Sequence, residues 1–111
     1  MKRQTKYRAV KGEIDGYRFD SQAEGRRYLA LRDRLQRGEI RDLEPHPPAY
    51  RLDVNGVLVS RYTPDFRYVV IETGETVVED VKSNPTRTRD YVMRRKLMRA
   101  VHGIEITEVM G

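Results

Sequence analysis

The sequence predicts one α/β domain, in which a mixed β-sheet made of an antiparallel meander and a closing strand is flanked by two helices and preceded by an N-terminal hairpin. Three observations support this fold class. The chain of 111 residues suits a single domain with one modest core. Two segments carry apolar residues at helical spacing, and the segments between them alternate as strands do. A last alternating segment follows the second helix, so it can return to the sheet by a crossover.

Short local patterns predict the first hairpin and the first helix. The Asp15-Gly16 pair favours a tight hairpin turn, whose central residues need positive φ. Ser21, followed three residues later by Glu24, is a capping-box pattern that begins a helix. Gly38 is a natural stop, so we expect the helix to end at the residue before it. Its apolar face would be formed by Ala23, Tyr28, Leu31 and Leu35.

The middle of the chain has the patterns of strands and turns. Three prolines within residues 45–48 exclude a central strand and predict an edge or a bend there. Asn55-Gly56 is a strong hairpin turn between alternating segments. Residues 65–71 and Thr76–Lys82 are extended and separated by a turn. With the Asn55-Gly56 hairpin they would complete the meander.

The C-terminal part predicts a second helix and the closing strand. Residues 88–102 carry apolar side chains at helical spacing, and Gly103 ends this pattern. Residues 104–109 alternate and are expected to form the last strand. The apolar side chains of the second helix are those of Tyr91, Met93, Leu97, Met98 and Val101.

The charge of the chain favours a polyanionic partner. Lys and Arg outnumber Asp and Glu by 22 to 17, which gives a net charge of +5 and a pI near 9.7. Residues 1–9 would form a basic arm, and residues 87–99 hold six cations against one acid. The alternative is a loose basic tail and a solvated helix face. The cations expected to contact phosphates are Lys2, Arg3, Lys6, Arg8, Arg87, Arg89, Arg94 and Arg95.

Other features exclude several classes of protein. The chain has no cysteine, which excludes disulfides, thiolate metal sites and a cysteine nucleophile. No apolar run approaches the roughly 20 residues that span a bilayer, and no apolar stretch of a secretory signal follows the charged N-terminus. We therefore expect a cytoplasmic protein with no membrane contact and no organic cofactor.

Two acids and a lysine are expected to meet at one end of the sheet. Alternation along a strand puts Asp80 and Lys82 on the same face, and the expected strand pairing places Asp65 opposite Lys82 and diagonal to Asp80. Two neighbouring carboxylates are costly unless a cation lies between them. Oxygen ligands without cysteine favour Mg²⁺ or Mn²⁺ over zinc. A metal with Lys82 can supply what phosphodiester hydrolysis needs: an activated water, positive charge on the transition state and a stabilised leaving oxygen.

The residues that carry this chemistry resemble a known signature. The Pro64-Asp65 pair and the Asp80-Val81-Lys82 triplet are similar to the motif of the PD-(D/E)xK nuclease superfamily. Residues 19–24 resemble the segment that supplies an acid from the first helix in small phage and prophage nucleases akin to Holliday-junction resolvases. Order and spacing agree over residues 6–109. The resemblance implies a restriction-endonuclease-like core, and a bacterium or a phage-infected cell as the host of the protein.

The resemblance also implies a role for each residue. Asp65 and Asp80 would bind the metal directly, the Val81 carbonyl would be a further ligand, Glu24 would bind through a water, and Lys82 would be the catalytic lysine. The implied enzyme is a Mg²⁺-dependent DNA endonuclease, for which Mn²⁺ would substitute, that leaves a 5′-phosphate and a 3′-hydroxyl. Branched DNA is the favoured substrate, cut by a C2 homodimer with two identical sites.

Other interpretations of the same residues stay open. The chain would instead be a single-strand or end-specific nuclease of phage recombination or repair, or a binding module without catalysis, and RNA is not excluded as the substrate. Glu24 would only close the capping box with Ser21. Asp65 would be a turn residue after proline, and Asp80 and Lys82 would form cross-strand ion pairs with Glu or Arg neighbours on an exposed sheet face.

Three further predictions concern neighbouring residues. Glu79 points to the face opposite Asp80 and is expected to pair with an arginine. His46 and His102 are expected in a loop and at a helix end, without a catalytic role. Tyr62, Tyr68 and Tyr91 are expected in the core or at its rim.

Overall fold

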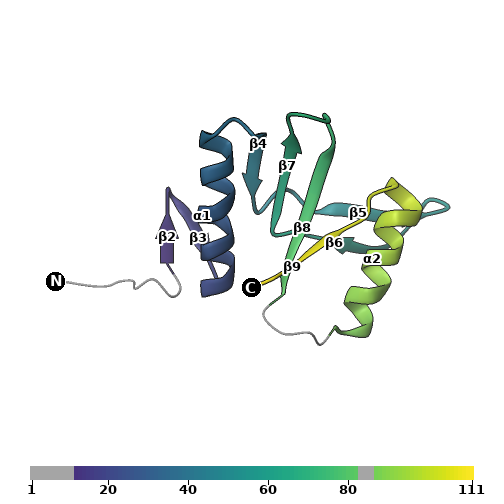
Figure 1. The fold of residues 1–111 in the computed structure, drawn as a ribbon. Helices are drawn as coiled ribbons and strands as arrows, with labels where there is room; N and C mark the ends of the chain where they lie inside the picture. The colour runs from purple at the N-terminus through teal and green to yellow at the C-terminus, as the bar shows by residue number, and fades with distance from the viewer. Residues whose placement is uncertain (1–11, 83–86) are drawn as a thin grey trace.

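Figure 1 shows the fold in a computed structural model, which describes residues 12–82 and 87–111. The predicted basic arm, with Lys2, Arg3, Lys6 and Arg8, lies outside the described residues. The elements follow the chain in this order: β2 (Gly12–Ile14), β3 (Tyr17–Phe19), α1 (Gln22–Gln36), β4 (Ile40–Pro45), β5 (Tyr50–Val54), β6 (Val57–Tyr62), β7 (Phe66–Val70), β8 (Thr76–Lys82), α2 (Arg89–His102) and β9 (Thr107–Met110).

The predicted fold class is confirmed. A four-stranded sheet has the order β4-β7-β8-β9, in which β4, β7 and β8 are antiparallel and β9 runs parallel to β8. The connection from β8 to β9 is the predicted helical crossover through α2. Figure 1 shows α1 and α2 on opposite sides of this sheet, with the β2-β3 hairpin beside α1.

The composition of the meander differs from the prediction. Strands β5 and β6 form a separate two-stranded sheet, and β4 instead lies beside β7 as an edge strand. The prolines explain the difference. Strand β4 ends at Pro45, and the following Pro47 and Pro48 have no N–H groups with which to continue a ladder. The chain turns out of the sheet at His46, which has a φ of 51°. The predicted edge at these prolines is confirmed.

Turns and caps follow the predicted patterns closely. Asn55 and Gly56 have φ values of 51° and 81°, the left-handed backbone that a two-residue hairpin needs. Ser21 Oγ accepts a hydrogen bond from Glu24 N at the start of α1. The last strand is shorter than predicted, since β9 begins at Thr107. The N–H of Ile104 is bonded back to the carbonyl of Met98, so this residue still belongs to the helix end.

The sheet separates two clusters of buried side chains. The α1 side contains Phe19, Tyr28, Leu31, Ile40, Phe66 and Tyr68, and the α2 side contains Leu52, Tyr62, Val78, Tyr91, Met98 and Ile106. Strand β8 supplies both, because Val77 and Val81 face α1 while Val78 faces α2. The apolar helix faces are narrower than predicted, since Leu35, Met93 and Val101 are exposed. Neither described helix is long and apolar enough to cross a membrane.

Candidate active site

Asp65 stands where strands β7 and β8 stop pairing. Its N–H donates to the Glu79 carbonyl over 2.9 Å, and its Oδ2 accepts from the N–H of Val81 over 2.7 Å. In a longer β7, a backbone carbonyl from the residues before Phe66 would accept this hydrogen bond from Val81. The Asp65 carboxylate takes the place of that carbonyl. The Val81 carbonyl points to the same side as its N–H. It thus faces the space beside Asp65, as a metal ligand would.

The strand register differs from the prediction by two residues. Phe66 pairs with Glu79, so Asp65 falls opposite Asp80 and not opposite Lys82. The turn between the strands explains this difference. Val70 N donates to the Glu75 carbonyl and Gly74 N donates to the Val70 carbonyl. Residue 70 therefore lies opposite residue 75, whereas the prediction placed residue 71 opposite residue 76. The shift brings the two acids of the predicted site closer together.

Asp80 and Lys82 form an ion pair that is largely buried. Lys82 Nζ lies 2.9 Å from Asp80 Oδ1, and the two side chains are only 18% and 13% exposed, respectively. The other oxygen, Oδ2, accepts a hydrogen bond of 2.7 Å from the Tyr62 hydroxyl. The alternative interpretation placed these residues in cross-strand ion pairs on an exposed face, whereas they pair with each other along β8 and are largely buried. The ion pair lies between the sheet, β6 and α2.

Glu24 lies in the first turn of α1 and interacts electrostatically with Asp65 and Asp80. Burial raises the pKa of Glu24, and the charges of Asp20 and Asp80 raise it further, while His46 opposes them. Burial also raises the pKa of Asp65 to about 6, against the lowering effect of the Val81 N–H, and the charges of Glu24 and Asp80 add to the rise. The three carboxylates thus lie within electrostatic range of one another.

Among residues 12–82 and 87–111, no three His, Asp or Glu side chains are grouped closely enough to hold a metal ion as they stand. Both oxygens of Asp80 have protein partners, and Asp65 Oδ2 has one. The donor chemistry nevertheless suits a hard divalent cation, because each carboxylate oxygen has a further lone pair and the mutual repulsion of the acids would be relieved. Glu24 and Asp80 would have to move toward Asp65 to share an ion.

The family of the chain follows from comparison with family models. A model described as a protein of unknown function, DUF1064, matches residues 4–108. The chain belongs to this family. Comparisons with curated proteins and with solved structures gave no match. The part of the chain that matches DUF1064 contains all four candidate catalytic residues.

The predicted phosphate-binding arginines of this DUF1064 chain are largely engaged within the protein. Arg87 Nε donates to Glu108 Oε1 at 2.8 Å, while Arg95 Nη1 and the Tyr91 hydroxyl donate to Glu108 Oε2 at 3.0 and 2.8 Å. The hydrogen bond from Arg87 is the main reason that the pKa of Glu108 is lowered to about 2. Arg94 Nε donates to Ser60 Oγ at 3.3 Å. The cationic cluster is therefore partly neutralised, which the sequence did not reveal.

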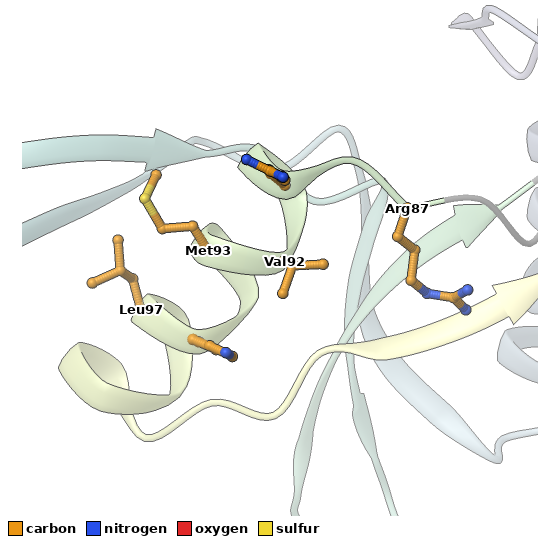
Figure 2. A pocket seen from close by; sticks show the side chains of 6 residues that line it. Arg87, Val92, Met93 and Leu97 are labelled. Carbon is orange, nitrogen blue, oxygen red and sulfur yellow. The ribbon is translucent and has the colours of Figure 1, made fainter.

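Arg89 lies apart from the candidate site. Arg89 lines a pocket of about 460 Å³ together with Val92, Met93 and Leu97 of α2. Figure 2 shows these three apolar side chains on the helix. None of Glu24, Asp65, Asp80 and Lys82 lines this pocket. It is not the place where the predicted chemistry would occur.

Sequence reasoning missed three residues around the candidate site of this DUF1064 member. Tyr62 contacts Asp80, and Tyr91 and Glu108 lie on the same side of the sheet. The parallel register pairs Asp80 with Glu108, so the two carboxylates are neighbours on adjacent strands. Alternation along residues 104–109 indicated which residues share a face, but the pairing of β9 with β8 is a long-range property that no local pattern contains.

The predicted positions of Glu79, the two histidines and Tyr68 agree with the structure. Glu79 is fully buried on the α1 side and pairs with Arg27, whose Nε and Nη2 donate to its two oxygens at 2.9 and 2.6 Å. His46 lies outside regular elements, and His102 is the last residue of α2. Each histidine contacts a backbone carbonyl, of Arg18 and Arg51 respectively. Tyr68 also belongs to the α1-side core, where its hydroxyl donates to Glu79.

Proposed function

We propose that this DUF1064 member is a Mg²⁺-dependent endonuclease that hydrolyses phosphodiester bonds in DNA. The observation that carries the proposal is the arrangement of Asp65, whose carboxylate is bonded to the backbone of Val81 between Asp80 and Lys82. A binding domain gains nothing from partly buried acids that repel phosphate at this position. A hydrolase gains a cation site beside a lysine.

The roles of the residues follow from their positions. Asp65, Asp80 and the Val81 carbonyl would hold the metal, and Glu24 would reach it through a water. The metal, when bound, supplies a water of lowered pKa and positive charge. Lys82 donates N–H groups toward the scissile phosphate or the attacking water, and Asp80 keeps its ammonium at the site. Burial of the acids excludes bulk water and strengthens these interactions.

DNA is the proposed substrate because the chain is basic and the signature of its site resembles that of DNA nucleases. Branched DNA, cut by a C2 homodimer in the cytoplasm, is the preferred form of the proposal. The resemblance to resolvase-like phage and prophage nucleases supports this form, and a single-strand or end-specific nuclease is its nearest variant. Arg89, Arg94, Arg95 and the basic arm would contact the phosphate backbone.

A binding module without catalysis is the second candidate. It is favoured by the two partners of Asp80, since Lys82 and Tyr62 already engage both of its oxygens. In such a protein the acids would serve the fold alone. The two candidates differ in whether a divalent cation changes what the protein does to a bound nucleic acid.

A cleavage assay on a panel of substrates tests the proposal. The purified protein is incubated with a four-way junction, a flap, a duplex and a single strand of DNA, and with an RNA duplex, in Mg²⁺, Mn²⁺, Ca²⁺ or EDTA. We expect cleavage with Mg²⁺ and Mn²⁺ and none with EDTA, the junction being cut fastest and the nicks being ligatable. Binding without cleavage under every condition would overturn the nuclease and favour the binding module.

A further inference from the structure

Lys82 is held between a carboxylate and an aromatic ring. Its Nζ lies 3.4 Å from the centroid of the Tyr91 ring and 2.9 Å from Asp80 Oδ1. An ammonium over a ring face is attracted by the negative charge of the π system. The lysine side chain is only 18% exposed, so little water competes with this contact. Two partners on two elements, β8 and α2, thus fix the position of one flexible side chain.

Tyr91 is itself held by hydrogen bonds at its backbone and at its hydroxyl. Its backbone N–H donates to Thr88 Oγ1 at the N-terminus of α2, over 3.1 Å. Its hydroxyl donates to Glu108 Oε2, and Glu108 in turn binds Arg87 and Arg95. The ring is 6% exposed and belongs to the α2-side core. It cannot swing away from Lys82 without breaking its partly buried hydrogen bond to Glu108.

We propose that Tyr91 is a positioning residue, which holds the Lys82 ammonium beside Asp80 and so keeps it ready for a substrate phosphate. Lysine has a long stem and three rotatable donors, so without support its charged end samples many positions. A ring is well suited to this task because it attracts the cation without cancelling its charge. A second carboxylate in the same place would repel the phosphate. The catalytic consequence rests on the proposed nuclease function, whereas the holding of Lys82 does not.

Tyr68 provides a matched control. It is also a buried tyrosine, 3% exposed, and its hydroxyl also donates to a glutamate, but it lies on the α1 side of the sheet. If Tyr91 served only the core, Tyr91→Leu and Tyr68→Leu would have the same kinds of effect. If Tyr91 positions Lys82, only the Tyr91 variant changes the behaviour of that lysine.

The first test compares cleavage with DNA binding. Tyr91→Leu should lower kcat by about tenfold or more, as expected for a displaced catalytic group, while DNA affinity in EDTA changes by less than about twofold. Tyr91→Phe keeps the ring and should restore kcat to within about threefold of the wild type. Tyr68→Leu should leave kcat per folded molecule unchanged. If Tyr91→Leu does not fold, Tyr91→Met takes its place.

The second test observes Lys82 directly and needs no activity. The chain has five lysines, whose amines are methylated with ¹³C and observed by NMR, the Lys82 signal being identified by its loss in Lys82→Arg. The ring current should move this signal upfield in the wild type and in Tyr91→Phe, and the shift should vanish in Tyr91→Leu. The same Lys82 signal in all three would overturn the inference, as would undiminished cleavage by Tyr91→Leu. A wild type that cuts nothing would instead overturn the proposed function, and the Lys82 signal would still decide whether Tyr91 holds the lysine.

Discussion

The carboxylate of Asp65 accepts a 2.7 Å hydrogen bond from the backbone N–H of Val81, the residue between Asp80 and Lys82. This bond joins β7 and β8 beyond their last paired residues, Phe66 and Glu79. It fixes an acid from one strand beside the acid and the lysine of the other. The bond has a structural role in closing the ladder, and substitutions can separate this role from the proposed catalysis.

Replacing Asp80 tests the centre of the proposed site. Asp80→Ala should abolish cleavage, because it removes a proposed metal ligand and the anchor of Lys82. DNA binding in EDTA should be kept or become tighter, since a negative charge that repels the backbone is lost. The matched control is Asp33→Ala, which removes an exposed acid from α1 and should leave cleavage unchanged. A folded Asp80→Ala protein that binds no DNA would contradict the assignment.

Replacing Asp65 by asparagine tests the electrostatics without breaking its bond to Val81, because the amide oxygen still accepts. The pKa of Asp65 is raised to about 6 from an ordinary 3.8, so the folded protein binds this proton more tightly than the unfolded chain does. The free energy of unfolding of the metal-free protein should therefore fall as pH rises from about 4 to about 6. Above this window Asp65→Asn should be more stable than the wild type by about 2 kcal/mol, measured by urea unfolding in EDTA.

Glu108 should affect the pH dependence of stability in the opposite direction to Asp65. Its pKa is lowered to about 2 from an ordinary 4.5, so its contribution to stability is present above pH 4.5 and is lost as pH falls toward 2. The two groups thus act in opposite directions and in different windows. An Asp65→Asn protein with the same pH dependence of stability as the wild type between pH 4 and 6 would show that the Asp65 carboxyl is not perturbed.

Two substitutions at the start of α1 distinguish a cap from a ligand. Ser21→Ala removes the acceptor for Glu24 N and should cost about 1 kcal/mol of stability, with cleavage per folded molecule unchanged. Glu24→Gln should alter stability little and lower cleavage by about tenfold or more, as the loss of an outer metal contact does. Thermal unfolding and cleavage rates are measured for both. Equal cleavage by Glu24→Gln and the wild type would leave Glu24 a capping residue.

The arginines of α2 should contribute to DNA binding in spite of their internal contacts. Arg95 uses Nη1 to bind Glu108, and its guanidinium has five N–H donors in all. Arg94→Ala and Arg95→Ala should each weaken DNA binding and lower the slope of log K against log salt by about 0.9. Arg37→Ala, at the far end of α1, serves as the control. Unchanged slopes for both α2 variants would show that the DNA-binding surface does not include Arg94 and Arg95.

The buried pair of Glu79 and Arg27 should matter for stability alone. Glu79→Ala leaves the Arg27 guanidinium and the Tyr68 hydroxyl without their shared partner, which should cost about 3–5 kcal/mol. The activity of the molecules that remain folded should be close to that of the wild type, because this side chain points away from Asp80. Urea unfolding measures the loss, and cleavage rates are corrected for the folded fraction.

Local patterns predicted most of the elements, because turns and caps are decided by a few neighbouring residues. Asp15-Gly16, Asn55-Gly56 and Ser21 all act as their chemistry requires. The predicted register of β7 on β8 was wrong by two residues, because the hydrogen bonds of the turn at Val70 and Gly74 decide the register.

The surroundings of the candidate site depend on long-range packing. No pattern in the sequence shows that Tyr91 and Glu108 come to Lys82 and Asp80, since that follows from how α2 and β9 return to the sheet. The neutralisation of Arg87 and Arg95 by Glu108 was missed for the same reason. Pairing of Glu79 with an arginine was predicted, since alternation alone places it on the opposite face from Asp80.

The fully buried Glu79 also fixes how β8 is aligned in the sheet. A one-residue slip of β8 would turn its side chains to the opposite face, so that Asp80 would take the place of Glu79 beside Arg27 and Val81 would take the place of Asp80 beside Tyr62. Aspartate is one methylene shorter than glutamate and valine is apolar, so neither side chain fits the partners that it would meet. Arg27 binds both oxygens of Glu79 and so holds β8 in its alignment. Shortening the turn at residues 72–75 by one residue would shift β8 and disrupt the candidate site, although the sequence of the strand itself is unchanged.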